Sequence, residues 1–326
     1  EQADYIIRSA AIHDDNPEVV RARQRGIPVF ERAEGWGALM QGYQKAICVA
    51  GTHGKTSTTS RISHIALASD VDPTIMRGGN LTAIGGGHRV GLKREMILLE
   101  SCEYCNSFLH FCPTTAVILN VEADHLDFFK DLADIQNSFR KFAELVPAGG
   151  AIVANGDDKN TMDALGGLEL LTFGFDESNT YRAVNCSADF REFDVLKHGK
   201  HLVHIATKVV GKHNVYNALS TIVAADCLGI APEAMAAGLA TFGGADRRMQ
   251  FKGQYNGADL YDDYAHHPGE LNALLTAAKT MGYKRIICAF QPHTYTRTHA
   301  LFEEFIEELK LVDIAVLAEI YAARES

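Results

Sequence analysis

The sequence has no long apolar run and no excess of basic residues. A membrane-spanning helix needs about 18 or more consecutive apolar residues, and no such run occurs in the 326 residues. The 31 lysines and arginines are outnumbered by 41 aspartates and glutamates, which gives a net charge of −10. We therefore expect no membrane span and no nucleic-acid partner, although a local basic pocket could still bind phosphates.

The sequence also lacks a cysteine framework and a secretion signal. Its seven cysteines are scattered, and a chain of this length needs no disulfides, so a reducing cytoplasm is the simplest setting. The first ten residues, EQADYIIRSA, lack the basic start and apolar stretch of a signal peptide. Cys102 and Cys105 form one C-x-x-C. A zinc site completed by His110 and Cys112 is a weaker interpretation than thiols packed in a turn.

A glycine-rich first turn is missing as well, although strand and helix patterns alternate from the start. Residues 5–9 predict a short buried strand. Asn16 and Pro17 then predict the cap and first turn of a helix that ends before Gly26. Such alternation is typical of a parallel α/β sheet. Because a nucleotide-type fold normally opens with the glycine-rich turn, we expect this first unit to be incomplete.

Changes of pattern divide the chain into three expected units. Residues 1–45 form a partial N-terminal unit, residues 46–245 a central unit, and residues 246–326 a partial C-terminal unit. The central unit opens with the apolar strand KAICVAG (45–51), and its later part, residues 165–210, has the short alternating pieces of antiparallel hairpins. The predicted fold class is α/β, with a central parallel sheet of the phosphate-loop type.

The stretch GTHGKT, Gly51 to Thr56, stands between the apolar strand and a helical pattern. Backbone N–H groups at a helix N-terminus bind anions, Lys55 can place a charge between phosphates, and the Thr56 hydroxyl can ligate Mg²⁺. The common loop has a glycine where this chain has Val49, so Gly51 predicts a tighter loop. A turn without a ligand has no need of the lysine, and we therefore predict a nucleotide site.

Polar residues follow two further buried strands. Glu100 and Glu103 come at the end of MILLE, and His125 lies in NVEADHLD, residues 120–127, after TAVIL. Carboxyl ends of parallel strands meet at the ligand-binding edge of a sheet, so these groups and Thr56 favour a metal–phosphate site. For Glu100 or Glu103 alone a solvated loop acid is an equal alternative, and for NVEADHLD a helix cap is the alternative.

Amides recur at the start of a later helix. In GKHNVYNAL, residues 211–219, Asn214 and Asn217 are three residues apart and share a helix face. Amide groups can read an adenine edge through paired donor and acceptor bonds. An N-cap and a core amide explain the same spacing equally well.

Three charged stretches mark the C-terminal unit. Arg248, in the pair with Arg247, could stabilise charge on a transferring phosphoryl group. In DDYAHHP, the Asp263 carboxylate could accept hydrogen bonds from ribose hydroxyls. His266 and His267 in the same stretch could contact a substrate. In QPHTYTR, Arg297 could hold a carboxylate. Taken one at a time, solvated charged turns explain these residues better.

Taken together and in this order, GTHGKTSTT, NVEADHLDFF, GKHNVYNAL, RRMQFKG, DDYAHHPGE and FQPHTYTRT closely resemble the motifs of the Mur ligase family. The resemblance runs from about residue 5 to residue 325, and FQPHTYTRT with DDYAHHP is similar to the branch that adds L-alanine. It implies the three-domain α/β architecture of that family, with Rossmann-like outer domains. It also implies ATP-dependent ligation of L-alanine to UDP-N-acetylmuramate through an acyl phosphate, in the cytoplasm of a bacterium, during peptidoglycan synthesis. We also consider that the protein could form a homodimer.

The resemblance implies catalytic and metal-binding roles for individual residues. Lys55 would cradle the ATP phosphates, and Thr56 would hold one Mg²⁺. Glu103 would hold magnesium near the γ-phosphate, and His125 a second ion on the side of the acyl phosphate. Arg248 would touch the γ-phosphate.

The resemblance also implies binding roles. Asn214 and Asn217 would face adenine, Asp263 the ribose. Tyr264, His266 and Arg297 would line the amino-acid pocket. The ATP-binding loop would comprise Gly51, Thr52, His53, Gly54, Lys55, Thr56 and Ser57.

Several departures keep alternatives open. Many family members have arginine at the position of Thr294, which leaves Arg297 with more of the carboxylate binding. Some siblings use a modified lysine where this chain has Arg140, so none is expected here. The missing glycine-rich start removes the part that resembling enzymes use for the UDP diphosphate. A sibling ligase for muropeptide recycling or another amino acid is one alternative, and a nucleotide-binding fragment without turnover is another.

Overall fold

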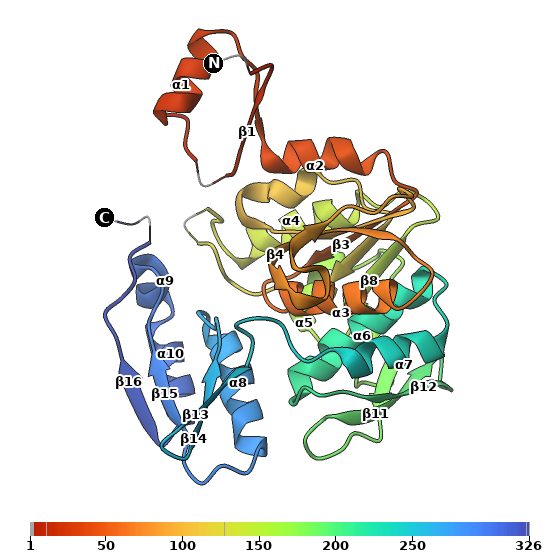
Figure 1. The fold of residues 1–326 in the computed structure, drawn as a ribbon, viewed down its shortest axis with the longest axis vertical. Helices are drawn as coiled ribbons and strands as arrows, with labels where there is room; N and C mark the ends of the chain where they lie inside the picture. The colour runs from red at the N-terminus through yellow and green to blue at the C-terminus, as the bar shows by residue number, and fades with distance from the viewer. Residues whose placement is uncertain (1–2, 11, 127, 324, 326) are drawn as a thin grey trace.

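The centre of the molecule is one large twisted sheet with helices on both faces (Figure 1). The computed structural model describes residues 3–10, 12–126, 128–323 and 325. The sheet has ten strands in the order β12-β11-β10-β9-β8-β7-β3-β6-β4-β5. They are β3 (Lys45–Ala50), β4 (Pro73–Leu81), β5 (Gly86–Arg89), β6 (Met96–Glu100), β7 (Thr115–Ile118), β8 (Ala151–Asn155), β9 (Leu171–Gly174), β10 (Tyr181–Val184), β11 (Glu192–Lys197) and β12 (Lys200–Ala206).

The sheet is parallel in its middle and antiparallel at both edges. All pairs from β10 through β9, β8, β7, β3 and β6 to β4 are parallel, whereas β10–β11, β11–β12 and β4–β5 are antiparallel. The predicted parallel strands therefore lie on both sides of β3, the strand that leads into the glycine loop. The hairpin expected within residues 165–210 is present, but it extends the same sheet instead of standing apart. Strands β4 and β5 were not predicted.

The central strands are buried on both faces, which explains their continuous apolar sequence. In β3, Ile47 and Val49 point into one core and Ala46, Cys48 and Ala50 into the other. The first core is covered by α3 (Lys55–Leu67), α6 (Lys212–Cys227) and α7 (Pro232–Thr241), and the second by α4 (Leu132–Ala143) and α5 (Lys159–Leu165). Helix α4 was expected from residue 129 but begins at Leu132, because the Asp131 carboxylate caps it by accepting from the Asp134 N–H.

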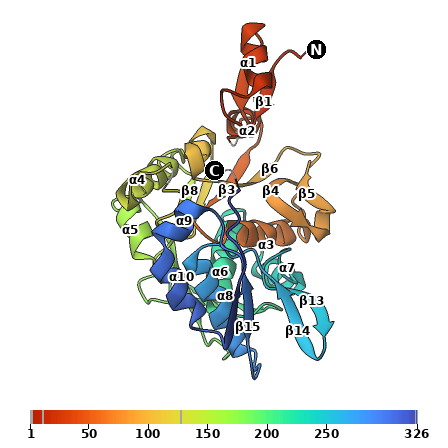
Figure 2. The ribbon, with the colours of Figure 1, turned by 90° about the vertical axis from the view of Figure 1, so that its left-hand side faces the viewer.

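The first residues form a small parallel pair that stands off the central sheet (Figures 1 and 2). The paired strands are β1 (Ile6–Arg8) and β2 (Val29–Glu31), and α1 (Pro17–Gln24) connects them. The predicted cap of α1 is confirmed, since the Asn16 side chain accepts from the Glu18 N–H. Helix α2 (Arg32–Met40) joins this pair to the rest. A Cβ at Gly37 would lie 1.9 Å from the His110 carbonyl oxygen, so only glycine lets α2 approach the 3₁₀ segment η2 (Tyr104–His110) this closely. Beside it, Trp36 packs against the second core.

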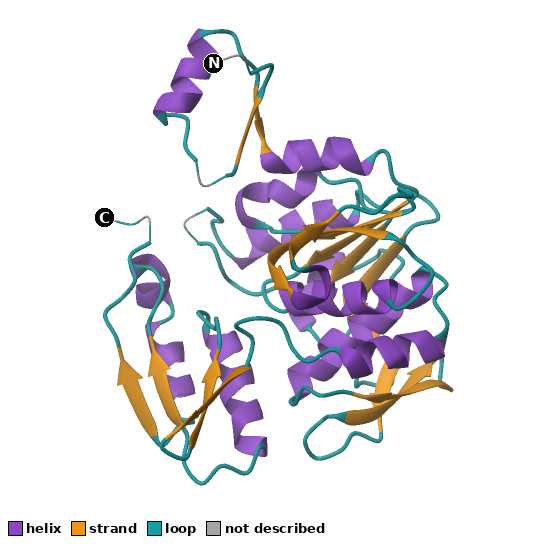
Figure 3. Ribbon diagram, viewed as in Figure 1, coloured by secondary structure: helices purple, strands orange, loops and turns teal. Residues whose placement is uncertain are grey.

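The C-terminal residues form a separate layer (Figure 3). A hairpin of β13 (Gln250–Tyr255) and β14 (Ala258–Asp262) turns at Asn256-Gly257. After α8 (Pro268–Thr280) come the strand β15 (Ile287–Phe290), the helices α9 (Tyr295–Ala300) and α10 (Phe302–Leu309), and the strand β16 (Ile314–Leu317). Strands β15 and β16 pair in parallel. Among the described residues, the buried core cluster of this layer consists of Leu271, Leu275, Phe290 and Phe305.

No helix within the described parts of the chain is both long and apolar enough to cross a bilayer.

Candidate active site

The glycine loop of residues 51–54 ends β3 and begins α3. Gly51 and Gly54 both have positive φ, 142° and 83°. A Cβ at Gly51 would lie 2.9 Å from that of Leu119, and a Cβ at Gly54 would lie 2.6 Å from Asn217 Oδ1. Both positions therefore require glycine, for conformation and for space. This is the tighter loop that the G-x-x-G-K-T spacing predicts.

The loop is fastened to the segment that follows β7. The Asn120 side chain accepts from the His53 N–H at 2.8 Å and donates to the His53 carbonyl at 3.2 Å. The Thr52 hydroxyl accepts from the Glu122 N–H at 2.9 Å, and the Thr52 N–H donates to the Asn120 carbonyl at 3.1 Å. The motif NVEADHLD thus holds the backbone of the loop, a function that its sequence did not reveal. Asp127, the last residue of that motif, lies outside the described residues.

Lys55 and Thr56 each meet a carboxylate from the end of β6. Lys55 Nζ lies 3.0 Å from Glu103 Oε2, and Thr56 Oγ1 donates to Glu100 Oε1 at 2.6 Å. Burial lowers the pKa of Lys55, but Glu103 outweighs this and holds it above its ordinary value. The lysine is therefore charged. The structure brings together all three predicted strand-end groups, since His125 Nε2 lies 3.9 Å from Glu103 Oε1.

The donor atoms here suit a hard cation. Two carboxylates and a hydroxyl are oxygen ligands of the kind that Mg²⁺ prefers. Burial lowers the pKa of His125, against the opposing effect of Asp124 and Glu103, which leaves a neutral imidazole able to ligate a metal. Thr56, Glu103 and His125 therefore fit the metal-binding role expected of them, and Glu100 is a further candidate.

Arg297 reaches this edge of the sheet from the C-terminal layer. Its Nε and Nη2 both donate to Asp124 Oδ1, at 3.1 and 2.9 Å. Burial raises the pKa of Asp124, but His125 and Arg297 hold it well below its ordinary value. The ion pair thus links α9 to the segment that carries His125. Asp124 was not singled out from the sequence.

A cavity of about 380 Å³ lies beside the glycine loop. Asn214, Asn217 and Asp263, the residues expected for the nucleoside, line it together with Gly54 and Ser57 of the expected ATP-binding loop. The amides are already engaged, because Asn214 Oδ1 accepts from Arg61 Nη2 at 2.5 Å and Asn217 Oδ1 accepts from the Thr58 hydroxyl at 3.3 Å. Asp263 accepts two backbone N–H groups, from residues 249 and 265.

A second cavity of about 800 Å³ also borders the loop. Lys55, Thr56, His125, Tyr264 and His266 line it. Four residues line both cavities and mark their junction: His53, Gly54, Arg248 and Glu270. A nucleotide in the first cavity and a second substrate in the other would therefore meet at the phosphate loop.

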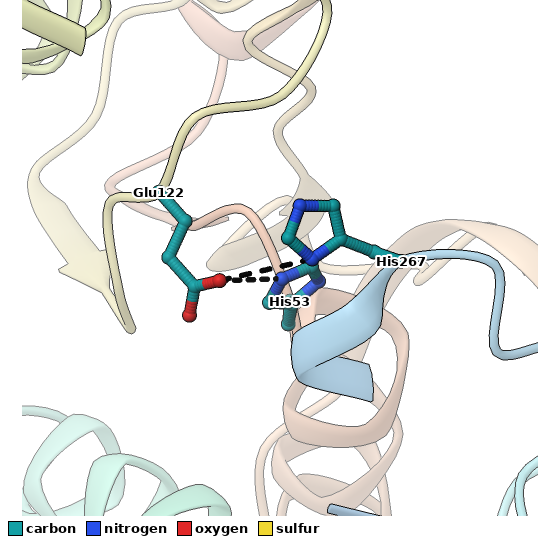
Figure 4. Close-up of side chains that lie close together, drawn as sticks. All are labelled: His53, Glu122 and His267. Atoms are coloured by element: carbon teal, nitrogen blue, oxygen red, sulfur yellow. Dashed lines mark hydrogen bonds and ion pairs between the residues drawn. The ribbon is translucent and has the colours of Figure 1, made fainter. Parts of the chain in front are cut away.

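A cluster at this junction was not anticipated from the sequence (Figure 4). His53, Glu122 and His267 place ligand-type atoms within 4.8 Å of one another. His53 Nε2 lies 3.2 Å from Glu122 Oε2, and His53 Nδ1 lies 3.6 Å from Glu270 Oε1. Burial lowers the pKa of His53, but the two carboxylates outweigh it and raise the pKa to about 9. Glu122 and Glu270 look like ordinary turn acids in the sequence, and no local signal distinguishes them.

The cysteines do not form the zinc site that was weighed as an alternative. All seven are reduced, and the three-residue cluster at His53 is the metal-type grouping found within the described ranges. The C-x-x-C and its neighbours take no part in it.

Three family models match successive parts of the chain. The Mur ligase family, catalytic domain, matches residues 1–44. The Mur ligase middle domain matches residues 49–225, and the Mur ligase, glutamate ligase domain matches residues 247–325.

Similar proteins agree with these matches. UDP-N-acetylmuramate–L-alanine ligase of Agathobacter rectalis is 47% identical over 99% of this chain and 71% of its own length. The crystal structure of UDP-N-acetylmuramate-alanine ligase MurC from Thermotoga maritima has a TM-score of 0.83 at 30% identity, covering 98% of this chain and 72% of that one. The Neisseria meningitidis ligase that joins UDP-N-acetylmuramate to L-alanyl-γ-D-glutamyl-meso-diaminopimelate has a TM-score of 0.66 at 28% identity, covering 74% of this chain and 79% of that one.

Proposed function

The chain belongs to the Mur ligase family, and from that premise we propose that it joins L-alanine to UDP-N-acetylmuramate at the expense of ATP. The product is an amide bond in a peptidoglycan precursor. Both substrates of the activation step are nucleotides, so the cytoplasm of a bacterium is the compartment that the proposal implies.

One observation carries the proposal beyond the comparisons. The two cavities meet at His53, Gly54, Arg248 and Glu270, with Lys55 at the same point. A γ-phosphoryl group held there faces the second cavity, where a carboxylate substrate would lie. An ATP hydrolase needs only the first cavity, whereas a ligase that activates a carboxylate needs both, joined at the phosphate.

The residues divide the first step among them. The carboxylate oxygen of the muramoyl group attacks the γ-phosphorus, and ADP leaves. Lys55 and Arg248 supply positive charge where negative charge accumulates on the transferring group. Mg²⁺, when bound, would neutralise phosphate charge further; Thr56 and Glu103 would hold one ion and His125 a second. The glycine loop supplies helix-terminal N–H groups.

The second step depends on holding the amine in place. The amine of L-alanine attacks the acyl carbon, the C–O bond to phosphate breaks, and inorganic phosphate leaves. Arg297 is directed by its two bonds to Asp124, beside His125, so an alanine carboxylate on this guanidinium brings its amine to the same edge. Tyr264 and His266 line the second cavity together with His125.

The test is amino-acid-dependent release of phosphate from ATP with UDP-N-acetylmuramate, compared across L-alanine, glycine and L-serine. We expect L-alanine to give the highest kcat/KM. A wide margin for another amino acid, or turnover only with a peptide, would instead support a sibling ligase of the recycling type.

A nucleotide-binding protein without turnover is the remaining alternative. Its signature is calorimetric binding of ADP and ATP with no phosphate release under any of these conditions. The homodimer stays a prediction, checked by the molar mass in solution from light scattering.

A further inference from the structure

Glu270 receives more contacts than any role given to it so far requires. It lies in the first turn of α8, and its side chain is 8% exposed. Its Oε1 accepts from Arg248 Nη1 at 2.9 Å and lies 3.6 Å from His53 Nδ1. Its Oε2 accepts from the His266 N–H at 3.1 Å, and His266 Nδ1 lies 3.3 Å away. One carboxylate thus joins three positive or hydrogen-bonding partners.

These partners come from different parts of the molecule. His53 belongs to the phosphate loop at the start of α3, whereas Arg248 precedes β13 and His266 precedes α8. Glu270 is therefore the point at which the phosphate loop, Arg248 and the C-terminal layer are held together. It also lines both cavities, so it lies where a γ-phosphate would be transferred.

The bonding pattern favours an ionic bridge over a metal site at this junction. His53 presents its two ring nitrogens to two different carboxylates, Glu122 and Glu270. His267 Nδ1 accepts the Gly269 N–H at 3.2 Å, and its Nε2 faces the Ala123 carbonyl at 3.3 Å. Both nitrogens of each ring are thus turned toward protein groups. A protonated His53 between two carboxylates accounts for this arrangement without an ion.

Charge balance supports the same conclusion. Burial raises the pKa of Glu270, but His53, Arg248 and His266 outweigh it and hold the pKa well below its ordinary value. Asp263 and Glu122 are the other acids near this group, and His267 is the other imidazole beside His53. The ionised carboxylate therefore keeps Arg248 in one orientation, since a partly buried guanidinium without it would lose its anionic partner.

We propose that Glu270 is a positioning residue, which aims Arg248 at the γ-phosphate and, through His53, fixes α8 against the phosphate loop. The inference rests on the proposed function for the identity of the phosphate donor. It adds a residue that senses whether the C-terminal layer is docked, because the carboxylate that holds Arg248 also contacts His53 of the phosphate loop.

The test compares two nucleotides that differ only at the γ-phosphate. Calorimetry would measure binding of ADP and of a non-hydrolysable ATP analogue, each with Mg²⁺, to the wild-type chain and to Glu270→Gln. We expect the variant to bind the ATP analogue about tenfold more weakly, while ADP binding changes less than about twofold, because only the γ-phosphate meets Arg248. A purely structural role would weaken both nucleotides equally.

Two matched variants sharpen the result. Glu122→Gln removes the other carboxylate on His53 but leaves Arg248 untouched, and we expect it to keep the wild-type ratio of the two affinities. Glu233→Gln, on the exposed first turn of α7, controls for loss of charge. If Glu270→Gln fails to fold, Glu270→Asp keeps the charge on a shorter side chain, and it should show the same selective loss.

The outcomes separate this inference from the proposed function. Unchanged affinities in the Glu270 variant, or equal loss for both nucleotides, would overturn the inference even if L-alanine ligation is measured. A selective loss for the ATP analogue would support it even if another amino acid proves to be the acceptor. If the wild-type chain bound neither nucleotide, both would be wrong.

Discussion

The two sides of the candidate active site are held in different ways. The phosphate loop follows β3, whose residues from Ala46 to Ala50 are at most 1% exposed, and hydrogen bonds of Thr52 and His53 fasten it to the segment after β7. The C-terminal side has a core of four buried side chains, and in β16 every residue is exposed. It reaches the loop through Glu270, which pairs with His53, and it reaches the segment after β7 through Arg297, which pairs with Asp124.

This difference assigns phosphate binding to the loop side of the site and the groups needed for reaction to the C-terminal side. The backbone of the phosphate-loop side, called the rigid side below, is held by hydrogen bonds within the central unit, so we expect it to accept phosphates before the other side is docked. Arg248, Tyr264, His266 and Arg297 come from the C-terminal side, so the groups expected at the γ-phosphate and the amino acid depend on ionic contacts between layers. In many enzymes, loops or domains that close on the substrate complete the active site in this way.

The largest effect should come from removing the charge of the rigid side. Lys55→Ala should lower the rate of ATP-dependent ligation by about 10³-fold, because among the described residues no other lysine or arginine pairs with Glu103. Phosphate release measures the rate, and circular dichroism checks that the fold persists. Lys159→Ala, whose side chain is 85% exposed, is the matched control. Retained turnover in Lys55→Ala would remove the loop from the mechanism.

The second prediction compares a buried strand of the central sheet with an exposed strand of the C-terminal layer. Ile118→Ala in β7, at 0% exposure, should lower the free energy of unfolding by about 2–5 kcal/mol, because it leaves a cavity. Leu317→Ala in β16, at 64% exposure, should change it by less than about 0.5 kcal/mol. Urea denaturation followed by circular dichroism measures both. Equal losses would mean that the two layers are packed alike.

The third prediction breaks one ionic contact between the layers. Asp124→Asn should raise the KM for L-alanine about tenfold and leave the KM for ATP nearly unchanged, because Arg297 loses the anion that directs it. Steady-state kinetics with each substrate varied in turn measures the split. A parallel rise in both KM values would show that Asp124 supports the loop instead.

The smallest effect concerns pH. His53 has a folded-state pKa of about 9, above the ordinary value of 6.5, so its ionic bridge stabilises the fold fully below about pH 6.5 and is lost as pH rises through 9. The unfolding free energy of wild type should exceed that of His53→Gln by about 1–3 kcal/mol at pH 6, and the gap should shrink by pH 9.5. Urea titrations at several pH values measure the gap. A gap that does not vary with pH would mean that His53 is neutral.

Local patterns were enough for the rigid side. The apolar run of β3, the two glycines and the lysine are contiguous, and Asn16 with Pro17 marks a helix start within two residues. Strands β4 and β5 escaped prediction because Gly78, Gly79 and a run at residues 85–87 interrupt their apolar pattern.

The ionic side could not be predicted in the same way. Glu270 follows a Pro-Gly pair and looks like any solvated acid, and its partner His53 lies more than two hundred positions earlier. Asp124 and Arg297 are likewise separated by 173 residues. Such pairs exist only once the layers are docked, so neither periodicity nor motif spacing carries their signal.

The placement of Trp36 has a practical use. It is the only tryptophan in the sequence, and it packs where Gly37 lets α2 approach the η2 backbone. Indole emission shifts to longer wavelength when water reaches the ring. The intrinsic fluorescence of this protein is therefore a built-in gauge of how firmly α2 is seated, and it reports little about the nucleotide cavity, which Trp36 does not line. Unfolding curves read at this ring and by circular dichroism would reveal whether the N-terminal pair detaches before the sheet melts.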